Sequence, residues 1–167
     1  MDDKGEEKMG KAANSSISLK QIHVTDNFWN KYVHLVKDVI IPYQWDILND
    51  KLEDVETSHC IENFKIAAGE KEGEFQGAVF QDTDVAKWLE AVGFVLNYER
   101  DEKLEELADE TIELIGRAQQ PDGYLNTYFT IKEPDGRWSN LMEGHELYTV
   151  GHMIEAAVAY YEATGKR

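Results

Sequence analysis

Two helical patterns separated by a short break constrain the fold more than any other feature of this sequence. Between residues 102 and 118, apolar side chains recur every three or four positions while Glu and Asp occupy the other face, as in an amphipathic helix. A second helical pattern precedes it and begins at Asp82 or Thr83. The apolar face of that helix comprises Val85, Trp88, Leu89, Val92 and Leu96. Because only residues 97–101 separate the two patterns, we expect an antiparallel helical hairpin.

Further segments also have helical spacing. One begins at a cap at Thr25 or Asp26 and should kink or restart at Pro42, which lacks a backbone donor. Another is capped by Ser58 and ends at Gly69. The last helix runs from about His145 to Ala163. Its inward face is predicted to comprise Leu147, Val150, Ile154, Ala157, Val158 and Tyr161.

Two segments depart from the helical pattern. Residues 17–24 carry a weak strand-like alternation. Residues 119–144 show no helical period, contain two prolines and two glycines at turn positions, and are rich in aromatic side chains. Loops longer than about 12–15 residues in a compact domain are usually functional or disordered, and the aromatic content argues against disorder. We therefore expect this long loop to fold over a site.

Composition excludes several classes of partner. The formal net charge of −16 repels nucleic-acid backbones and anionic membrane surfaces. No apolar run approaches the roughly 20 residues of a membrane span. Residues 1–16 are polar, without the apolar core of a secretory signal, and are interpreted as a disordered tail. A cytoplasmic location is the default expectation. The single cysteine, Cys60, rules out an internal disulfide and a thiolate-rich zinc site within this chain.

Helical hairpins with one elaborated loop are typical of an α/α toroid or an α-solenoid. The fold class predicted is all-α, an incomplete (α/α) six-hairpin-type barrel formed by residues 17–167. A closed toroid needs about a dozen helices, whereas this chain supplies about five. We therefore expect it to be the N-terminal portion of a larger catalytic domain, with exposed apolar helix faces that favour self-association.

His145 and Tyr124 are the first candidates for binding a ligand. His145 lies at the start of the last helix, where a neutral imidazole can donate one hydrogen bond and accept another, as a sugar hydroxyl requires. Tyr124 follows the Pro121–Gly123 turn, which could project it into a cavity. For both residues a purely structural role is the alternative.

Asp82, Asp84 and Trp88 are further binding candidates. The two carboxylates could meet a polar ligand or simply cap the helix that they begin, and Trp88 could be a sugar platform or a core residue. No metal site is predicted, because His145 and His152 are about 10 Å apart along one helix. No acid and nucleophile pair stands out, so no catalytic residue is assigned, and Cys60 is interpreted as a small buried side chain.

Five motifs, in order along the chain, resemble glycoside hydrolase family 127, the β-L-arabinofuranosidases. They are VIIPYQW at 39–45, NFKIAAG at 63–69, VFQDTDVAKWLE at 79–90, AQQPDGYL at 118–125, and GHELY at 144–148 with Gly151-His152. The resemblance covers about residues 22–167. It implies an (α/α) barrel, a retaining mechanism, and a zinc-bound cysteine nucleophile with a glutamate acid/base.

The resemblance also indicates which functional residues lie within these 167 residues and which lie in the later part of the family's sequences. The zinc ligands and the nucleophile lie later in the family's chain and do not match Cys60, so the 167 residues alone are expected to be inactive. The histidine of the GHELY motif, His145 here, is the residue whose counterpart contacts the arabinofuranose ring. The partners implied are L-arabinofuranosides and the rest of the catalytic barrel. The alternatives are a helical protein-interaction module, or a lyase or epimerase on the same toroid.

Overall fold

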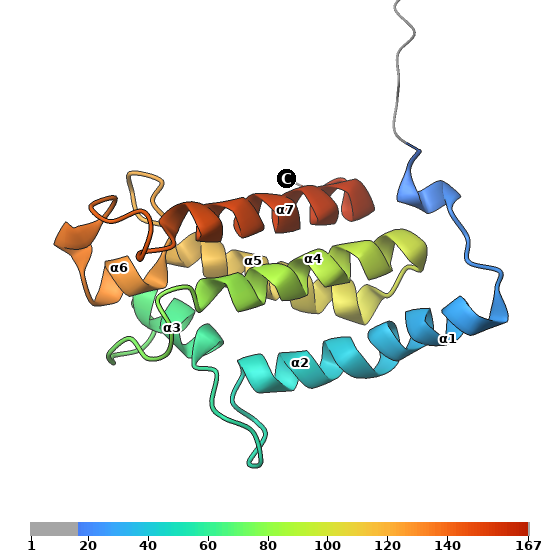
Figure 1. Ribbon diagram of the computed structural model, residues 1–167, viewed down its shortest axis with the longest axis horizontal. Coiled ribbons are helices and arrows are strands. Elements are labelled where there is room, and N and C mark those ends of the chain that lie inside the picture. Colours follow the sequence, from blue (N-terminus) through green and yellow to red (C-terminus); the bar gives the residue numbers. More distant parts are fainter. Residues whose placement is uncertain (1–16, 167) are drawn as a thin grey trace, which may run out of the picture.

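The computed structural model describes residues 17–166, and within them every regular element is helical (Figure 1). The predicted tail at residues 1–16 lies outside the described residues. The expectation of a strand at residues 17–24 is wrong, because the segment contains the single 3₁₀ turn η1 (Leu19–Gln21) followed by extended backbone. A strand needs a neighbouring strand for its hydrogen bonds, and the described part of the chain offers none.

The first long helix runs through Pro42 without a break. α1 (Asn27–Leu35) is capped by Asp26, whose carboxylate accepts hydrogen bonds from the amides of Phe28 and Trp29 at 2.8 and 3.0 Å. It continues through the π-helical turn η2 (Val36–Ile40) into α2 (Ile41–Leu48). Because a π turn bonds residues five apart, the helix adjusts just before Pro42, which stands in the first turn of α2. The predicted kink is thus replaced by a π segment.

α3 (Cys60–Ala67) begins differently from the prediction. Ser58 is not its cap, because His59 precedes the helix in the left-handed conformation with φ 57°. The amides of Ser58 and His59 instead donate to the carboxylate of Asp50 at 2.6 and 3.0 Å. The expected end at Gly69 is confirmed, with φ 72° at that glycine.

α4 (Asp82–Tyr98) and α5 (Glu102–Ala118) form the predicted antiparallel hairpin, and Asp101 caps α5. α7 (Glu146–Thr164) packs along α4 and runs parallel to it (Figure 1). Gly93 permits this close approach, since a Cβ at that position would lie 2.7 Å from the carbonyl carbon of Ala159. α4 is therefore the central helix, with α7 and the α1–α2 rod as neighbours.

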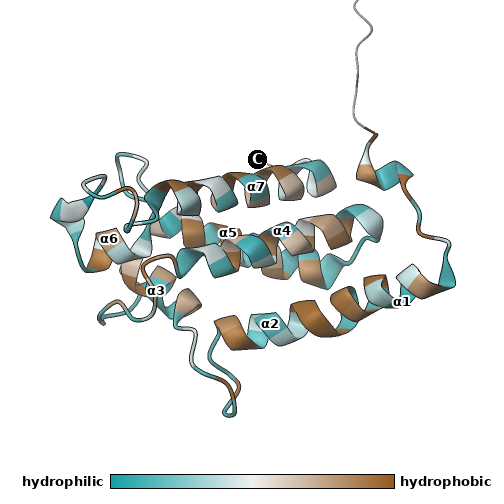
Figure 2. Cartoon of the chain, viewed as in Figure 1, coloured by the Kyte–Doolittle hydropathy of each residue, from teal (hydrophilic) through white to brown (hydrophobic). Residues whose placement is uncertain are grey.

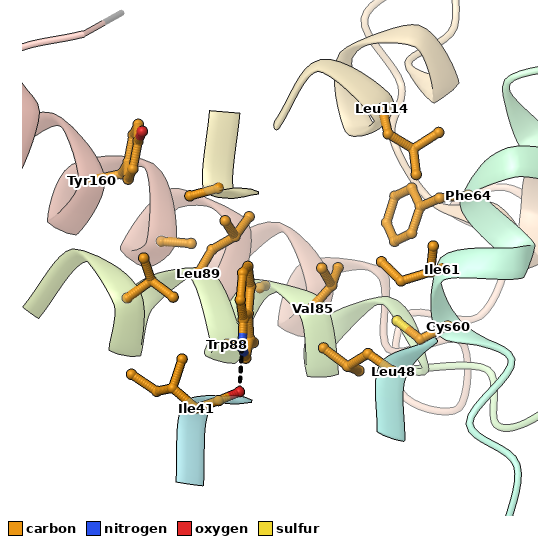
Figure 3. Packing of buried hydrophobic residues seen from close by; sticks show 14 of the residues in the cluster. Ile41, Leu48, Cys60, Ile61, Phe64, Val85, Trp88, Leu89, Leu114 and Tyr160 are labelled. Carbon is orange, nitrogen blue, oxygen red and sulfur yellow. Dashed lines mark hydrogen bonds between the residues drawn. The ribbon is translucent and has the colours of Figure 1, made fainter. Parts of the chain in front are cut away.

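Trp88 lies in the middle of the core and is 1% exposed. Its indole N–H donates to the carbonyl of Ile41 at 3.1 Å (Figure 3). Its ring also packs against that of Trp45, with centroids 4.5 Å apart. This places one large aromatic residue between α4 and α2, with its polar atom satisfied. Trp88 is therefore a core residue and not a sugar platform, because its ring has no exposed face on which a sugar could stack.

The predicted inward face of α7 is wrong at five of its six positions, since only Val150 is half-buried. Leu147, Ile154, Val158 and Tyr161 are exposed by 44–59%, and Ala157 is also exposed. α7 contacts α4 through small residues that include Ala156 and Ala159, because only a small side chain fits beside Gly93. The α1–α2 rod likewise carries exposed apolar residues, visible as brown bands in Figure 2. No helix among the described residues combines the length and apolarity needed to cross a bilayer.

Candidate substrate-binding site

Three segments meet at one end of the α4–α7 pair (Figure 1). They are the beginning of α4, the loop that follows α5, and the beginning of α7. They come to the same end because α7 runs parallel to α4 while α5 runs antiparallel to it. The loop is more regular than its sequence suggests, since it contains α6 (Thr127–Ile131) and the 3₁₀ turn η3 (Pro134–Gly136). Both are too short to produce a helical period.

A buried carboxylate at the start of α7 holds the loop in place. Glu146 is 1% exposed and accepts hydrogen bonds from the hydroxyl of Tyr124 at 2.5 Å and from the amide of Trp138 at 2.8 Å. The ring of Tyr124 is buried, and the guanidinium of Arg137 lies 4.1 Å from its centroid. Burial and the Glu146 carboxylate raise the pKa of Tyr124. Tyr124 is thus a neutral donor within the protein, and its hydroxyl is already committed to Glu146.

A second buried carboxylate joins α4 to α6. Asp82 is 1% exposed and accepts from the amide and the hydroxyl of Thr127 at 2.7 and 2.5 Å. Burial raises the pKa of Asp82 to about 6, and the two bonds from Thr127 oppose that shift. Asp82 begins α4 but satisfies an amide at the start of another helix, a capping role across elements. Its oxygens are therefore used within the protein and do not point at a ligand.

Asp84 and His145 are the predicted binding residues that remain accessible at this end. Asp84 is exposed and accepts a hydrogen bond from the side-chain amide of Gln81 at 2.9 Å. His145 is half-buried and stands just before α7 with φ 51°, a left-handed conformation that is costly for a residue with a Cβ. We expected His145 to be the first residue of the helix, but α7 begins one residue later, at Glu146, and His145 is its N-cap.

The ring of His145 is held by aromatic contacts and not by hydrogen bonds. Its centroid lies 5.2 Å from that of Phe80 and 6.0 Å from that of Tyr148, both in edge-on geometry. Among the described residues neither ring nitrogen has a hydrogen-bond partner. The imidazole is therefore fixed in position with its polar atoms available, as a group that recognises a hydroxyl must be.

Glu146, Thr127 and Phe80 are site residues that sequence reasoning missed. A glutamate in the first turn of a helix ordinarily complements the helix dipole in solvent, and nothing in the sequence around Glu146 indicates burial. Its only signal is its place directly after His145. Cys60, by contrast, behaves as predicted: it is fully buried, its thiol donates to the carbonyl of Gln81 at 3.3 Å, and burial raises its pKa well above the ordinary value. Burial of this kind is typical of a structural cysteine.

The described residues form helical hairpins with a polar and aromatic rim at one end, made by the starts of α4 and α7 and the loop after α5, as in a segment of an α/α barrel. Comparison identifies the family. The family model described as "β-L-arabinofuranosidase, GH127 catalytic domain" matches residues 21–167. The chain therefore belongs to glycoside hydrolase family 127. The predicted all-α barrel fold and the predicted family are thereby confirmed.

Individual relatives agree with this assignment. The chain is 42% identical over 160 residues to a non-reducing end β-L-arabinofuranosidase of Bifidobacterium longum, covering 86% of this chain and 24% of the relative. It resembles a crystal structure of a family 127 β-L-arabinofuranosidase from Geobacillus stearothermophilus T6, at 65% identity and a TM-score of 0.86, covering 87% of this chain and 23% of that one. A second β-arabinofuranosidase structure of the family matches at 35% identity and a TM-score of 0.80. The chain thus spans about a quarter of the length of these relatives.

Proposed function

We propose that this chain forms the first part of the barrel of an enzyme that hydrolyses terminal β-L-arabinofuranosyl bonds, and that His145 contributes to its sugar pocket. The observation that carries the proposal is the imidazole at the rim, fixed by Phe80 and Tyr148 with both nitrogens unused. The printed activity of the relatives supplies the substrate class. A neutral imidazole can accept from one ring hydroxyl and donate to another.

The buried carboxylates support this role by positioning. Glu146 fixes the loop from Tyr124 to Trp138, and it is the residue directly after His145. Asp82 fixes α6 against α4. Both groups are satisfied inside the protein, so they hold the rim rigid without taking part in sugar contact.

The chemical step requires residues that this chain does not present. Cys60 is buried and hydrogen-bonded, so it does not fit a zinc-bound nucleophile. We propose that the nucleophile, the acid/base and the zinc ligands belong to the remaining three quarters of the relatives' length. The 167-residue chain alone is then expected to bind at most weakly and to hydrolyse nothing.

A chimera tests the proposal. Residues 17–167 would replace the matching segment of the Geobacillus relative, to which the chain is 65% identical. The chimera should cleave an aryl β-L-arabinofuranoside. His145→Ala in that chimera should lower kcat/KM by roughly 5- to 150-fold, the equivalent of about 1–3 kcal/mol for a lost hydrogen bond that leaves a partner unpaired. His34→Ala, an exposed histidine on α1, is the matched control and should change nothing.

The outcomes separate the possibilities. An active chimera whose His145→Ala variant keeps unchanged kinetics would remove the assignment of His145 and leave the barrel role intact. A folded chimera without activity on β-L-arabinofuranosides, but with activity on another sugar, would favour a different carbohydrate-active enzyme on the same fold.

A helical interaction module remains the second candidate, and one observation favours it. A largely apolar groove of about 970 Å³ lies between α5 and α7, lined by residues that include Ile112, Leu125, Met153 and Ile154. In a barrel such a groove receives the next hairpin, and in a module it would receive a partner helix. The chimera distinguishes the two, because a module would not restore glycosidase activity.

A further inference from the structure

A histidine and two glutamates come together between α4 and α7, in a cluster that the rim site does not use. Glu90 belongs to α4, and His152 and Glu155 belong to α7, three positions apart. One ligand atom of each lies within 4.8 Å of those of the other two. The cluster thus places one imidazole nitrogen and two carboxylate oxygens from facing helices within 4.8 Å of one another.

Within α7, two of the three possible ligand atoms lie close together. His152 Nδ1 lies 3.1 Å from Glu155 Oε2. Nevertheless this nitrogen is buried and forms no hydrogen bond within the described residues. In a tetrahedral site with metal–ligand distances of about 2.0–2.1 Å, neighbouring donor atoms stand about 3.3 Å apart. The observed separation is close to that value.

The surroundings fix the imidazole and leave the carboxylate of Glu90 without a cation. The ring of Tyr148 packs edge-on against that of His152, with centroids 4.6 Å apart, so the orientation of the ligand is set in advance. Lys87, one turn before Glu90, is engaged elsewhere: its ammonium donates to the hydroxyl of Thr83 at 3.2 Å and lies 5.3 Å from the centre of the Tyr148 ring.

We propose that Glu90, His152 and Glu155 bind a divalent transition-metal ion, with Zn²⁺ as the probe of choice. One imidazole with two carboxylates suits Zn²⁺, Mn²⁺, Co²⁺ or Ni²⁺, whereas Mg²⁺ and Ca²⁺ prefer oxygen ligands alone. Helix bundles build metal sites from a glutamate on one helix and a Glu-x-x-His pair on another, and His152 and Glu155 have that spacing in the reverse order. Three protein ligands leave a position open for water, and the bound ion joins α4 to α7.

This site is distinct from any thiolate-held zinc of the family. Its ligands are nitrogen and oxygen atoms, and the single thiol of the chain, Cys60, is bonded to the carbonyl of Gln81. The proposal does not depend on the proposed function. It holds or fails on metal binding to the 167-residue chain, without any measurement of glycosidase activity.

Calorimetric titration of the whole chain with Zn²⁺ tests the site. We expect binding of one equivalent, a rise in the melting temperature, and a shift of the His152 imidazole resonances in NMR spectra. Glu90→Gln and His152→Ala should each weaken the affinity by more than about tenfold. His34→Ala is the control, since His34 forms an exposed pair with Asp38 at 3.8 Å and should leave binding unchanged. Mg²⁺ should neither bind nor shift the melting temperature.

Three results would overturn the proposal. The first is the absence of binding heat together with unshifted His152 resonances. The second is a Glu90→Gln variant that binds Zn²⁺ as tightly as the parent, which would reduce the cluster to an ordinary ion pair between His152 and Glu155. The third is loss of binding in the His34→Ala control. Circular dichroism confirms that each variant is folded, and Glu155→Gln provides an independent variant should His152→Ala unfold.

Discussion

The phenol of Tyr124 donates to the carboxylate of Glu146 at 2.5 Å, which joins the loop after α5 to the first turn of α7. Both residues are buried, so neither exchanges this partner for water. The bond is therefore a structural link between the end of one hairpin and the helix that carries the rim histidine.

Removal of this link should loosen the loop more than it destabilises the core. Tyr124→Phe deletes the hydroxyl and leaves the buried carboxylate of Glu146 with one donor fewer, at a cost of about 1–3 kcal/mol in the free energy of unfolding. Hydrogen exchange should speed up for amides of residues 124–145 but remain slow in α4. Chemical denaturation and exchange mass spectrometry measure the two effects. Equal acceleration in both regions would show that the link supports the whole fold instead of the loop.

Asp82 predicts a dependence of stability on pH. Its pKa in the folded chain is about 6, above the ordinary 3.8, chiefly because of burial. A raised folded pKa means that the folded state binds the proton more tightly, so this group's contribution is fully present below about pH 4 and is lost as pH rises through 6. The difference amounts to roughly 3 kcal/mol.

Asp82→Asn isolates that contribution. The amide keeps one acceptor oxygen for Thr127 but does not titrate, so the difference in unfolding free energy between parent and variant should change between pH 4 and pH 7 and stay constant below pH 4. Urea denaturation across this range provides the measurement. A constant difference over the whole range would mean that Asp82 titrates at its ordinary pKa.

The helices could be predicted from the sequence, whereas the contacts between segments that form the site could not. The periodic pattern from Val85 to Leu96 reports which face of α4 is buried, and that face is indeed in the core. A pattern of one helix does not say which neighbour covers which face. α7 is apolar on more than one side, so its own pattern does not show which side faces the core. The side that packs on α4 is determined by Gly93, which contacts Ala159 although it lies 66 positions earlier in the sequence.

The same limit applies to the rim. The position of His145 follows from the direction of the helices, which the hairpin pattern determines. The partners of Asp82 and Glu146 depend on how a 26-residue loop closes, and short-range sequence contains no period for it. Polar residues at helix starts therefore resembled dipole-complementing caps or ligand-binding groups. Two of them are buried acceptors that organise the loop.

Gly93 should be intolerant of any side chain. A Cβ there would lie within 3.0 Å of α7 backbone atoms of Ala159 and Tyr160, and helix backbone cannot give way as a flexible side chain can. Gly93→Ala should therefore destabilise the chain by about 1–3 kcal/mol, measured by thermal and chemical denaturation.

Gly116→Ala in α5 is the matched control. A Cβ at Gly116 meets nothing within 4 Å, so alanine there should stabilise the helix by about 0.5–1 kcal/mol. Opposite signs at the two glycines would establish that the close α4–α7 contact, and not helix propensity, decides the outcome at Gly93. Stabilisation by Gly93→Ala would mean that the two helices are further apart.

The exposed apolar face of α7 predicts self-association of the isolated chain. Leu147, Ile154 and Val158 are each more than half exposed, and apolar patches of this kind drive association in water. Ile154 also lines the groove between α5 and α7, so Ile154→Glu should place a charge in that interface and shift the chain toward monomer at a given concentration. Multi-angle light scattering over a range of concentrations measures this shift.

Glu113→Gln is the matched control, because Glu113 lines the same groove. The chain carries a net charge of −16, so removing one negative charge should favour the associated state. A parent chain that stays monomeric at high concentration would contradict the prediction.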